Sequence, residues 1–141
     1  MGIEENKAAV EKFHKGLNEE DASLINELIT DDFVLHAMGT DRDLGKEYIT
    51  QFNTRTYLSD FGATVEDMVA EGDKVAVRAT MKGTQTGQFG NIAPTGKTIS
   101  IPRFLFFRFE GSKITEVWNL NDRLGMFQQL GALPPTEEIG K

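Results

Sequence analysis

Four consecutive segments in the second half of the chain alternate between apolar and polar residues, and no other feature limits the fold more. They cover residues 62–72, 73–87, 97–111 and 112–121 and are rich in β-branched and aromatic residues, which is typical of strands. The sequences EGDK and EGSK join the first pair and the last pair, and both are tight-turn sequences. The four segments therefore predict an antiparallel meander in which FGNIAPTGKT, between the second and third strands, is the one long loop.

The first half of the chain has the spacing of amphipathic helices instead. Val10, Phe13 and Leu17 recur at three- and four-residue steps with Glu and Lys between them, and His14, close to two lysines, is predicted to lie on the solvated side. In chain order, the predicted elements are helices at residues 3–18 and 24–29, the second with Asp21 as N-cap, a strand at 31–38, a helix at 46–59, the four strands, and a last helix at Arg123–Leu130.

Helices in the first half and strands in the second predict an α+β fold in one domain of residues 1–141, with helices packed on one face of a curved antiparallel sheet. In the strand IPRFLFFRF, Phe104, Leu105, Phe106 and Phe107 are consecutive, so both faces of this strand are apolar. Helices can cover one of these faces. The other face is expected to line a cavity or to meet a partner subunit. A strand that is apolar on both faces therefore motivates the prediction of a homodimer.

The composition argues against several classes of function. The net charge of −7 repels phosphate backbones, so nucleic acid is not expected as a partner. The chain has no cysteine, which excludes disulfides and thiolate chemistry, and its two histidines and scattered carboxylates form no metal-ligand cluster. No apolar run approaches the roughly 20 residues of a membrane span, and no signal peptide is visible. A soluble, cytoplasmic protein without membrane contact is expected.

Asp122 stands between the last strand and the last helix, in EVWNLNDRLGMFQQLG, and it has two interpretations. As the residue before Arg123 it is a favoured N-cap, which would contribute about 0.5–2 kcal/mol to the stability of the protein. If the strand runs on to it, Asp122 lies on the same face as Trp118 and Leu120. A carboxylate on that face would have the position of a general base if the face lined a pocket. The residue types alone leave both interpretations open.

Two arginines interrupt apolar strands, and strand parity does not separate their roles. Arg78 lies in the middle of VAVRATM, and Arg103 opens the aromatic run. Each is either an outward-facing ion-pair partner of a carboxylate such as Asp67 or Glu116, or an anion stabiliser in a cavity.

Three stretches carry a resemblance to a known family. They are DDFVLH at the first strand, VAVRATMKGTQTGQFGNIAPTGKTI with its Pro-Thr-Gly-Lys turn, and EVWNLNDRLGMFQQLG at the end. Together they resemble the SnoaL-like polyketide cyclase and ester cyclase branch of the NTF2-like superfamily, over nearly the whole chain to Gly131. The resemblance implies a cone in which a strongly bent sheet wraps around helices and encloses a deep apolar pocket, and it implies that the protein is a dimer.

The resemblance also implies a chemistry. In the family, the carboxylate matching Asp122 serves as general acid/base in an intramolecular aldol ring closure that needs no metal or cofactor. His36 matches a histidine common at its place, where it would donate a hydrogen bond to a substrate oxygen. The expected ligand is a small apolar carbonyl compound or a polycyclic compound. The residues expected to bind it are Trp118, Phe104, Phe106, Arg78, Arg103, Phe52 and Tyr48.

Alternatives to a cyclase follow from the same residues. The strand TISIPRFLFFRFEG lacks the histidine that pairs with the aspartate in the well-studied polyketide cyclases, so a non-catalytic dimer that binds a small molecule is the main alternative. Limonene epoxide hydrolases need an arginine and an aspartate two apart on one strand, but Leu105 stands two places after Arg103. Ketosteroid isomerases need a buried tyrosine, and the only tyrosines, Tyr48 and Tyr57, lie in the predicted third helix. Both enzyme classes rank below the cyclase-like hypothesis.

Overall fold

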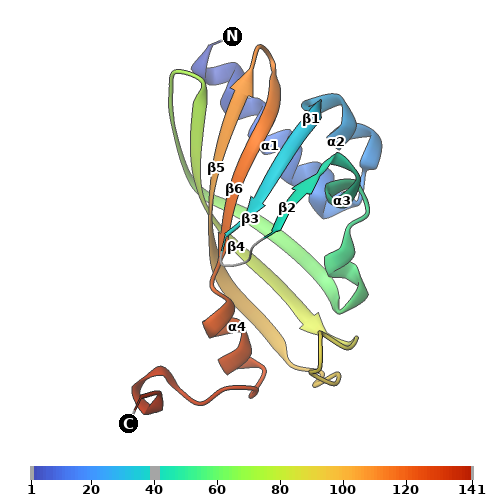
Figure 1. Ribbon diagram of the computed structural model, residues 1–141, viewed down its shortest axis with the longest axis vertical. Coiled ribbons are helices and arrows are strands. Elements are labelled where there is room, and N and C mark those ends of the chain that lie inside the picture. The colour runs from blue at the N-terminus through green and yellow to red at the C-terminus, as the bar shows by residue number, and fades with distance from the viewer. Residues whose placement is uncertain (1, 39–41, 141) are drawn as a thin grey trace.

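The computed structural model describes residues 2–38 and 42–140 and confirms the predicted α+β fold (Figure 1). The helices are α1 (Ile3–Glu19), α2 (Ala22–Leu28), α3 (Lys46–Thr50) and α4 (Arg123–Gln129), with short 3-10 helices η1 (Asn53–Thr56) and η2 (Thr136–Glu138). The strands are β1 (Ile29–Ala37), β2 (Arg42–Gly45), β3 (Leu58–Glu71), β4 (Lys74–Gln85), β5 (Thr98–Glu110) and β6 (Lys113–Asn121).

The strands form one curved, unclosed sheet in the order β2-β1-β6-β5-β4-β3. Strands β3 to β6 make the predicted antiparallel meander, and its tight turns place Gly72 at φ 60° and Gly111 at φ 63°, where glycine is favoured. Strand β1 pairs with β6 in parallel, which joins the first half of the chain to the meander. Helix α1 runs along the concave side of the sheet (Figure 1).

The concave side and α1 together form the main core. Val10, Phe13 and Leu17 of α1 are buried, as the helical spacing predicts, and the edge of the Phe13 ring meets Phe107 of β5 with ring centroids 5.4 Å apart. Alternate residues of β5 are buried on this side. We call this concave side of the sheet the inner face and the opposite side the outer face.

The prediction that His14 lies on the surface is wrong. Its side chain is buried between Phe13 and Phe107, and its Nδ1 lies 3.0 Å from the carbonyl oxygen of Val10. The buried stripe of α1 is wider than the predicted one because the helix lies against a concave surface that reaches around it. Burial lowers the pKa of His14 to about 4, so the imidazole is neutral at physiological pH.

The segment between β1 and β3 also differs from the prediction. The third helix ends at Thr50 and not near residue 59, because Phe52 adopts the left-handed conformation at φ 52° and residues Asn53–Thr56 form a 3-10 helix. Residues 42–45, predicted as loop, form β2 beside β1. The apolar spacing of Tyr48, Ile49 and Phe52 suits a helix, and all three side chains pack against the core, but only Tyr48 and Ile49 lie in α3.

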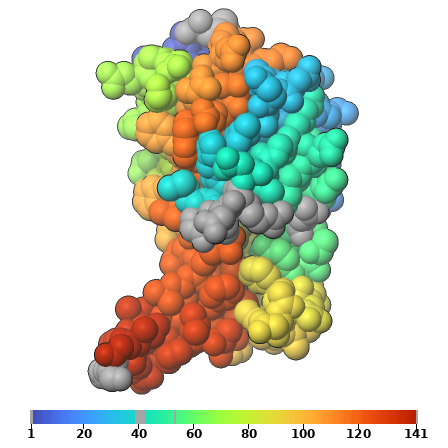
Figure 2. Space-filling view, in the orientation of Figure 1, coloured from blue at the N-terminus to red at the C-terminus, as the bar shows by residue number. Residues whose placement is uncertain are grey.

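The C-terminal segment from α4 onward extends away from the body of the sheet (Figures 1 and 2). Met126 and Leu130 of this segment are buried in a second cluster with Ile99 and Ile101 of β5. None of the helices in the described residues is both long and apolar enough to span a bilayer.

Candidate functional site

A cavity of about 130 Å³ lies on the inner face, between the sheet and the segment that contains α3 and η1. An engineered apolar cavity of about 150 Å³ holds one benzene molecule, so this cavity has room for about one aromatic ring. Its aromatic lining is Tyr48, Phe52, Tyr57 and Phe61, and the rest of the lining is Leu17, Leu35, Ala37, Met38, Leu44, Ile49, Thr54, Arg55, Met81, Arg103, Asn119, Asn121 and Arg123.

Three polar side chains, Arg103 of β5 and Asn119 and Asn121 of β6, form what we call the polar wall of the cavity. Arg103 and Asn121 are opposite each other across the two strands, and Asn119 is opposite Leu105. The Nε of Arg103 and the Oδ1 atoms of both asparagines are buried, and they have no hydrogen-bond partner among the described residues. Burial lowers the pKa of Arg103 to about 10, so the guanidinium remains charged at neutral pH. The polar wall thus has unused hydrogen-bonding groups at a cavity.

Aromatic rings and a second arginine make up another part of the cavity lining. The Arg55 guanidinium lies 3.9 Å from the centre of the Phe61 ring, and it donates to Glu20 at 3.0 Å and to the carbonyl of Leu17. Burial raises the pKa of Tyr57, whose ring stacks on Phe89 at 4.3 Å between centroids. Arg55 is therefore held by protein partners, in contrast to Arg103.

Asp122 lies outside this cavity lining, at the N-terminus of α4. Its Oδ1 accepts a hydrogen bond from the backbone N–H of Gly125 at 2.9 Å, and the residue is exposed. A side chain at position 125 would place its Cβ 2.1 Å from the Asp122 carboxylate, so glycine at this position leaves room for the cap. These contacts are those of a helix N-cap, and they are worth about 0.5–2 kcal/mol.

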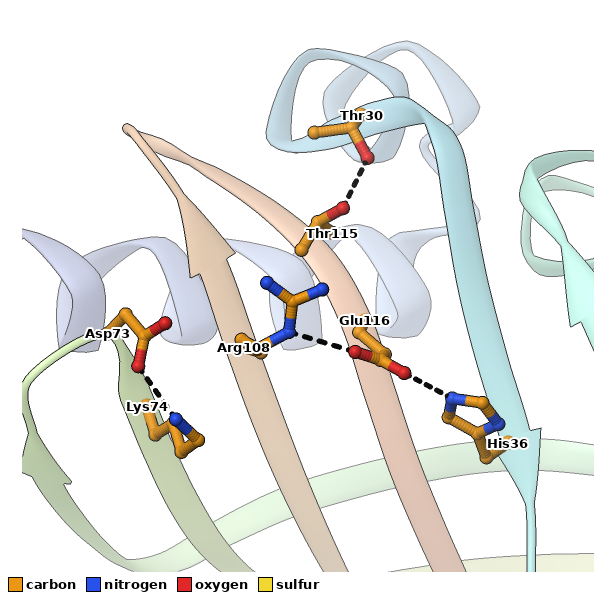
Figure 3. Close-up of polar contacts among 7 residues, drawn as sticks. All are labelled: Thr30, His36, Asp73, Lys74, Arg108, Thr115 and Glu116. Atoms are coloured by element: carbon orange, nitrogen blue, oxygen red, sulfur yellow. Dashed lines mark hydrogen bonds and ion pairs between the residues drawn. The ribbon is translucent and has the colours of Figure 1, made fainter.

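His36 lies on the outer face in a row of charged side chains (Figure 3). Its Nε2 donates to Glu116 at 2.5 Å, its Nδ1 lies 2.9 Å from Asp43, and Glu116 also accepts from Arg108 at 2.8 Å. The hydrogen bond to Glu116 raises the pKa of His36, and the bonds from His36 and Arg108 lower the pKa of Glu116. This row favours an imidazolium because both ring nitrogens face carboxylates.

Four of the residues expected to bind a ligand also lie on the outer face. Trp118 stacks on His36 with ring centroids 5.1 Å apart, and Phe106 meets the Trp118 ring edge-on with centroids 6.3 Å apart. Phe104 and Phe106 are 55% and 43% exposed. Arg78 is opposite Phe104 and donates to Asp67 at 2.6 Å and 2.9 Å, as its outward-facing interpretation requires. These aromatic rings, with Met38, Val69 and Leu120, line an open groove of about 340 Å³.

The structure thus divides the predicted site residues into three places. Tyr48, Phe52 and Arg103 meet at the inner cavity, Asp122 caps α4, and the remaining residues are brought together on the outer face. Sequence reasoning did not select Asn119 and Asn121. The alternation of VWNLN does not identify them, because only the structure shows that the two asparagines share the inner face with the buried Val117. No cluster of three metal-ligating side chains occurs in the described part of the chain.

The sequence matches the SnoaL-like polyketide cyclase family over residues 7–130. IdmH from Streptomyces antibioticus, described as a candidate polyketide cyclase, is 29% identical, with a TM-score of 0.80 over 89% of this chain and 98% of its own. TsrD from Streptomyces laurentii is 26% identical, with a TM-score of 0.80 over 94% and 99%.

A more distant structure extends the likeness in fold. A protein from Catenulispora acidiphila with a ketosteroid isomerase-like fold is 17% identical, with a TM-score of 0.74 over 89% of this chain and 93% of its own. No match was found among curated proteins.

Proposed function

This chain belongs to the SnoaL-like polyketide cyclase family, and on that premise we propose that it closes a ring in a small carbonyl compound held in the inner cavity. The observation that carries the proposal is the polar wall, because the Arg103 Nε and the Oδ1 atoms of both asparagines are buried at a cavity and have no hydrogen-bond partner among the described residues. The similarity to IdmH supports the same class of reaction. An intramolecular aldol closure needs no cofactor, because it has no net change in oxidation state. One proton leaves carbon, a C–C bond forms as the π bond of the second carbonyl breaks, and the new alkoxide oxygen takes up one proton.

The polar wall suits the enolate through which such a closure passes. Each asparagine amide has two N–H donors, and a donor aimed at a substrate carbonyl stabilises the negative charge that develops on its oxygen. Each also has an oxygen that can accept a hydrogen bond from an enol or from the new hydroxyl group. The aromatic lining around Tyr48 and Phe52 would shield an enolate from water, which strengthens these interactions.

The general base is a separate part of the proposal. Asp122 is the residue that the family resemblance predicts for this role, while its contact with Gly125 favours a cap. Asp122→Asn separates the two roles, because asparagine is as good an N-cap as aspartate but does not accept a proton.

Hydrogen–deuterium exchange in phenylacetone tests the proposal. The compound has one aromatic ring and an enolisable carbonyl, and we expect the protein to accelerate exchange of its benzylic protons in D₂O, followed by proton NMR. Asn119→Leu and Asn121→Leu should each slow the exchange by about 100-fold, the cost of losing one such donor. Asn26→Leu, an amide replaced on the exposed side of α2, is the matched control and should exchange at the wild-type rate.

The outcomes separate the hypotheses. Exchange that Asp122→Asn abolishes would support the aspartate mechanism, and exchange that it leaves unchanged would assign Asp122 to the cap. Saturable binding of phenylacetone without any exchange would favour the alternative, a non-catalytic dimer that binds a small molecule. Exchange that survives both replacements in the polar wall would contradict the proposed site.

We also propose that two copies of the chain pair through the outer face. Phe104, Phe106 and Leu120 are exposed there as one apolar surface, and burying such a surface favours association. Light scattering at micromolar concentration should give the mass of a dimer. Phe106→Glu places a charge in the middle of this surface and should give a monomer.

Ile3→Glu is the control for the dimer. It places the same charge on another exposed apolar residue, in the first turn of α1, and should leave the dimer intact. A wild-type protein that is monomeric at these concentrations would rule out the pairing.

A further inference from the structure

We propose that the ligand of the inner cavity carries a carboxylate and that the Arg103 guanidinium binds it. This inference rests on the proposed function for the place of the ligand, and it adds the chemical class.

The first observation is a buried charge without a counter-ion. Arg103 is 8% exposed, and among the described residues it has no ion pair and no hydrogen-bond partner for its Nε. Transfer of a guanidinium from water into a protein is unfavourable unless an opposite charge compensates it. Strongly desolvated charged groups at a cavity are therefore candidates for ligand contacts.

The second observation is the sign of the charge around the cavity. Its described lining contains the arginines Arg55, Arg103 and Arg123 and no aspartate or glutamate, although the whole chain has a net charge of −7. Glu20 already pairs with Arg55, which leaves the other two arginines without a carboxylate partner among the described residues. A cleft lined by one sign of charge concentrates ligands of the opposite sign. An anionic ligand is thus favoured over a neutral one.

The third observation is size and shape. The cavity of about 130 Å³ holds about one ring, and the rest of its lining includes Leu17, Met81 and the aromatic side chains. A guanidinium presents a planar fork that matches the two oxygens of a carboxylate. The combination points to an aromatic or similarly compact acid, with its ring against the apolar side chains and its carboxylate on Arg103. The asparagines of the polar wall remain available for the reacting carbonyl.

Calorimetric titration with benzoate and with benzamide tests this assignment. The two compounds have nearly the same shape and differ in charge, so we expect the wild-type protein to bind benzoate at least about tenfold more tightly than benzamide. Arg103→Met removes the charge at similar volume and should abolish this preference. Arg108→Met makes the same replacement on the outer face and should keep the wild-type preference. Arg103→Lys retains the positive charge but not the planar guanidinium, and it should keep part of the preference for benzoate.

Stability and exchange measurements complete the test. Arg103→Met should melt at or above the wild-type temperature without ligand, because the uncompensated charge is gone. Equal affinity of the wild-type protein for the two compounds, or undiminished benzoate binding by both Arg103 variants, would overturn the inference. Phenylacetone exchange reports separately on the proposed function. A preference for benzoate without phenylacetone exchange would support the carboxylate site and contradict the cyclase. Exchange without a preference for benzoate would support the cyclase and contradict the carboxylate site.

Discussion

Replacement of Gln85 by leucine is expected to lower the free energy of unfolding by about 3 kcal/mol or more, because one buried amide holds the long β4–β5 loop. The side chain is fully buried, and its Nε2 donates to the carbonyls of Gly87, Ile92 and Ala93 at 3.2–3.3 Å. Its Oε1 accepts from the backbone N–H and the hydroxyl of Thr95 at 3.1 Å and 2.7 Å. Leucine fills the space but makes none of these five hydrogen bonds. The carbonyl of Ile92 keeps its bond from the Phe89 N–H and the other partners are partly exposed to water, so each lost bond costs about 0.5–1.5 kcal/mol.

Urea unfolding of the purified variant measures this effect. Gln88→Leu is the matched control, since Gln88 is exposed in the same loop and makes one hydrogen bond, to the carbonyl of Gly90 at 2.9 Å. We expect the control to change stability by less than about 0.5 kcal/mol, as surface substitutions usually do. Equal unfolding midpoints for the two variants would show that Gln85 does not organise the loop.

The regular part of this fold follows from local patterns. Period-two alternation identifies the four strands of the meander, and the glycines of EGDK and EGSK mark its turns. Asp21 is the N-cap of α2, as predicted, and accepts a hydrogen bond from Leu24 at 3.1 Å. The parallel pairing of β1 with β6 joins segments about 80 residues apart, and no local pattern specifies such a contact.

The candidate site was harder to predict because alternation separates two faces without saying which face is concave. In VWNLN the apolar Trp118 and Leu120 suggest a buried face, and the asparagines a solvated one. The structure has the opposite arrangement, with Asn119 and Asn121 at the inner cavity and Leu120 50% exposed. Large apolar residues indicate a face that is covered, but they do not say whether the core of the same chain or a partner subunit covers it.

Acidification is expected to destabilise the protein through His14 well before the carboxylates titrate. Burial lowers the pKa of His14 from 6.5 to about 4, and the positive charge of Arg103 contributes to this shift. The unfolded chain therefore binds a proton below about pH 6.5 that the folded protein does not accept until about pH 4, so stability falls as the pH decreases through this window. The full loss is about 3 kcal/mol, of which about 2 kcal/mol falls between about pH 7 and about pH 5.

The two histidines should have opposite effects in this window, and this makes the cause testable. His36 has a raised pKa because of its bond to Glu116, so its imidazolium stabilises the folded state at acidic pH, and this contribution is lost as the pH rises through its folded-state pKa. Urea unfolding of the wild type should give a lower free energy of unfolding at about pH 5 than at about pH 7. His14→Leu should remove this decrease, and His36→Gln should make it larger. The carboxylates with lowered pKa values, such as Glu116, lose their contribution only at still lower pH, so they do not mask the comparison. A His14→Leu protein that loses as much stability as the wild type would mean that this buried imidazole does not control the acid response.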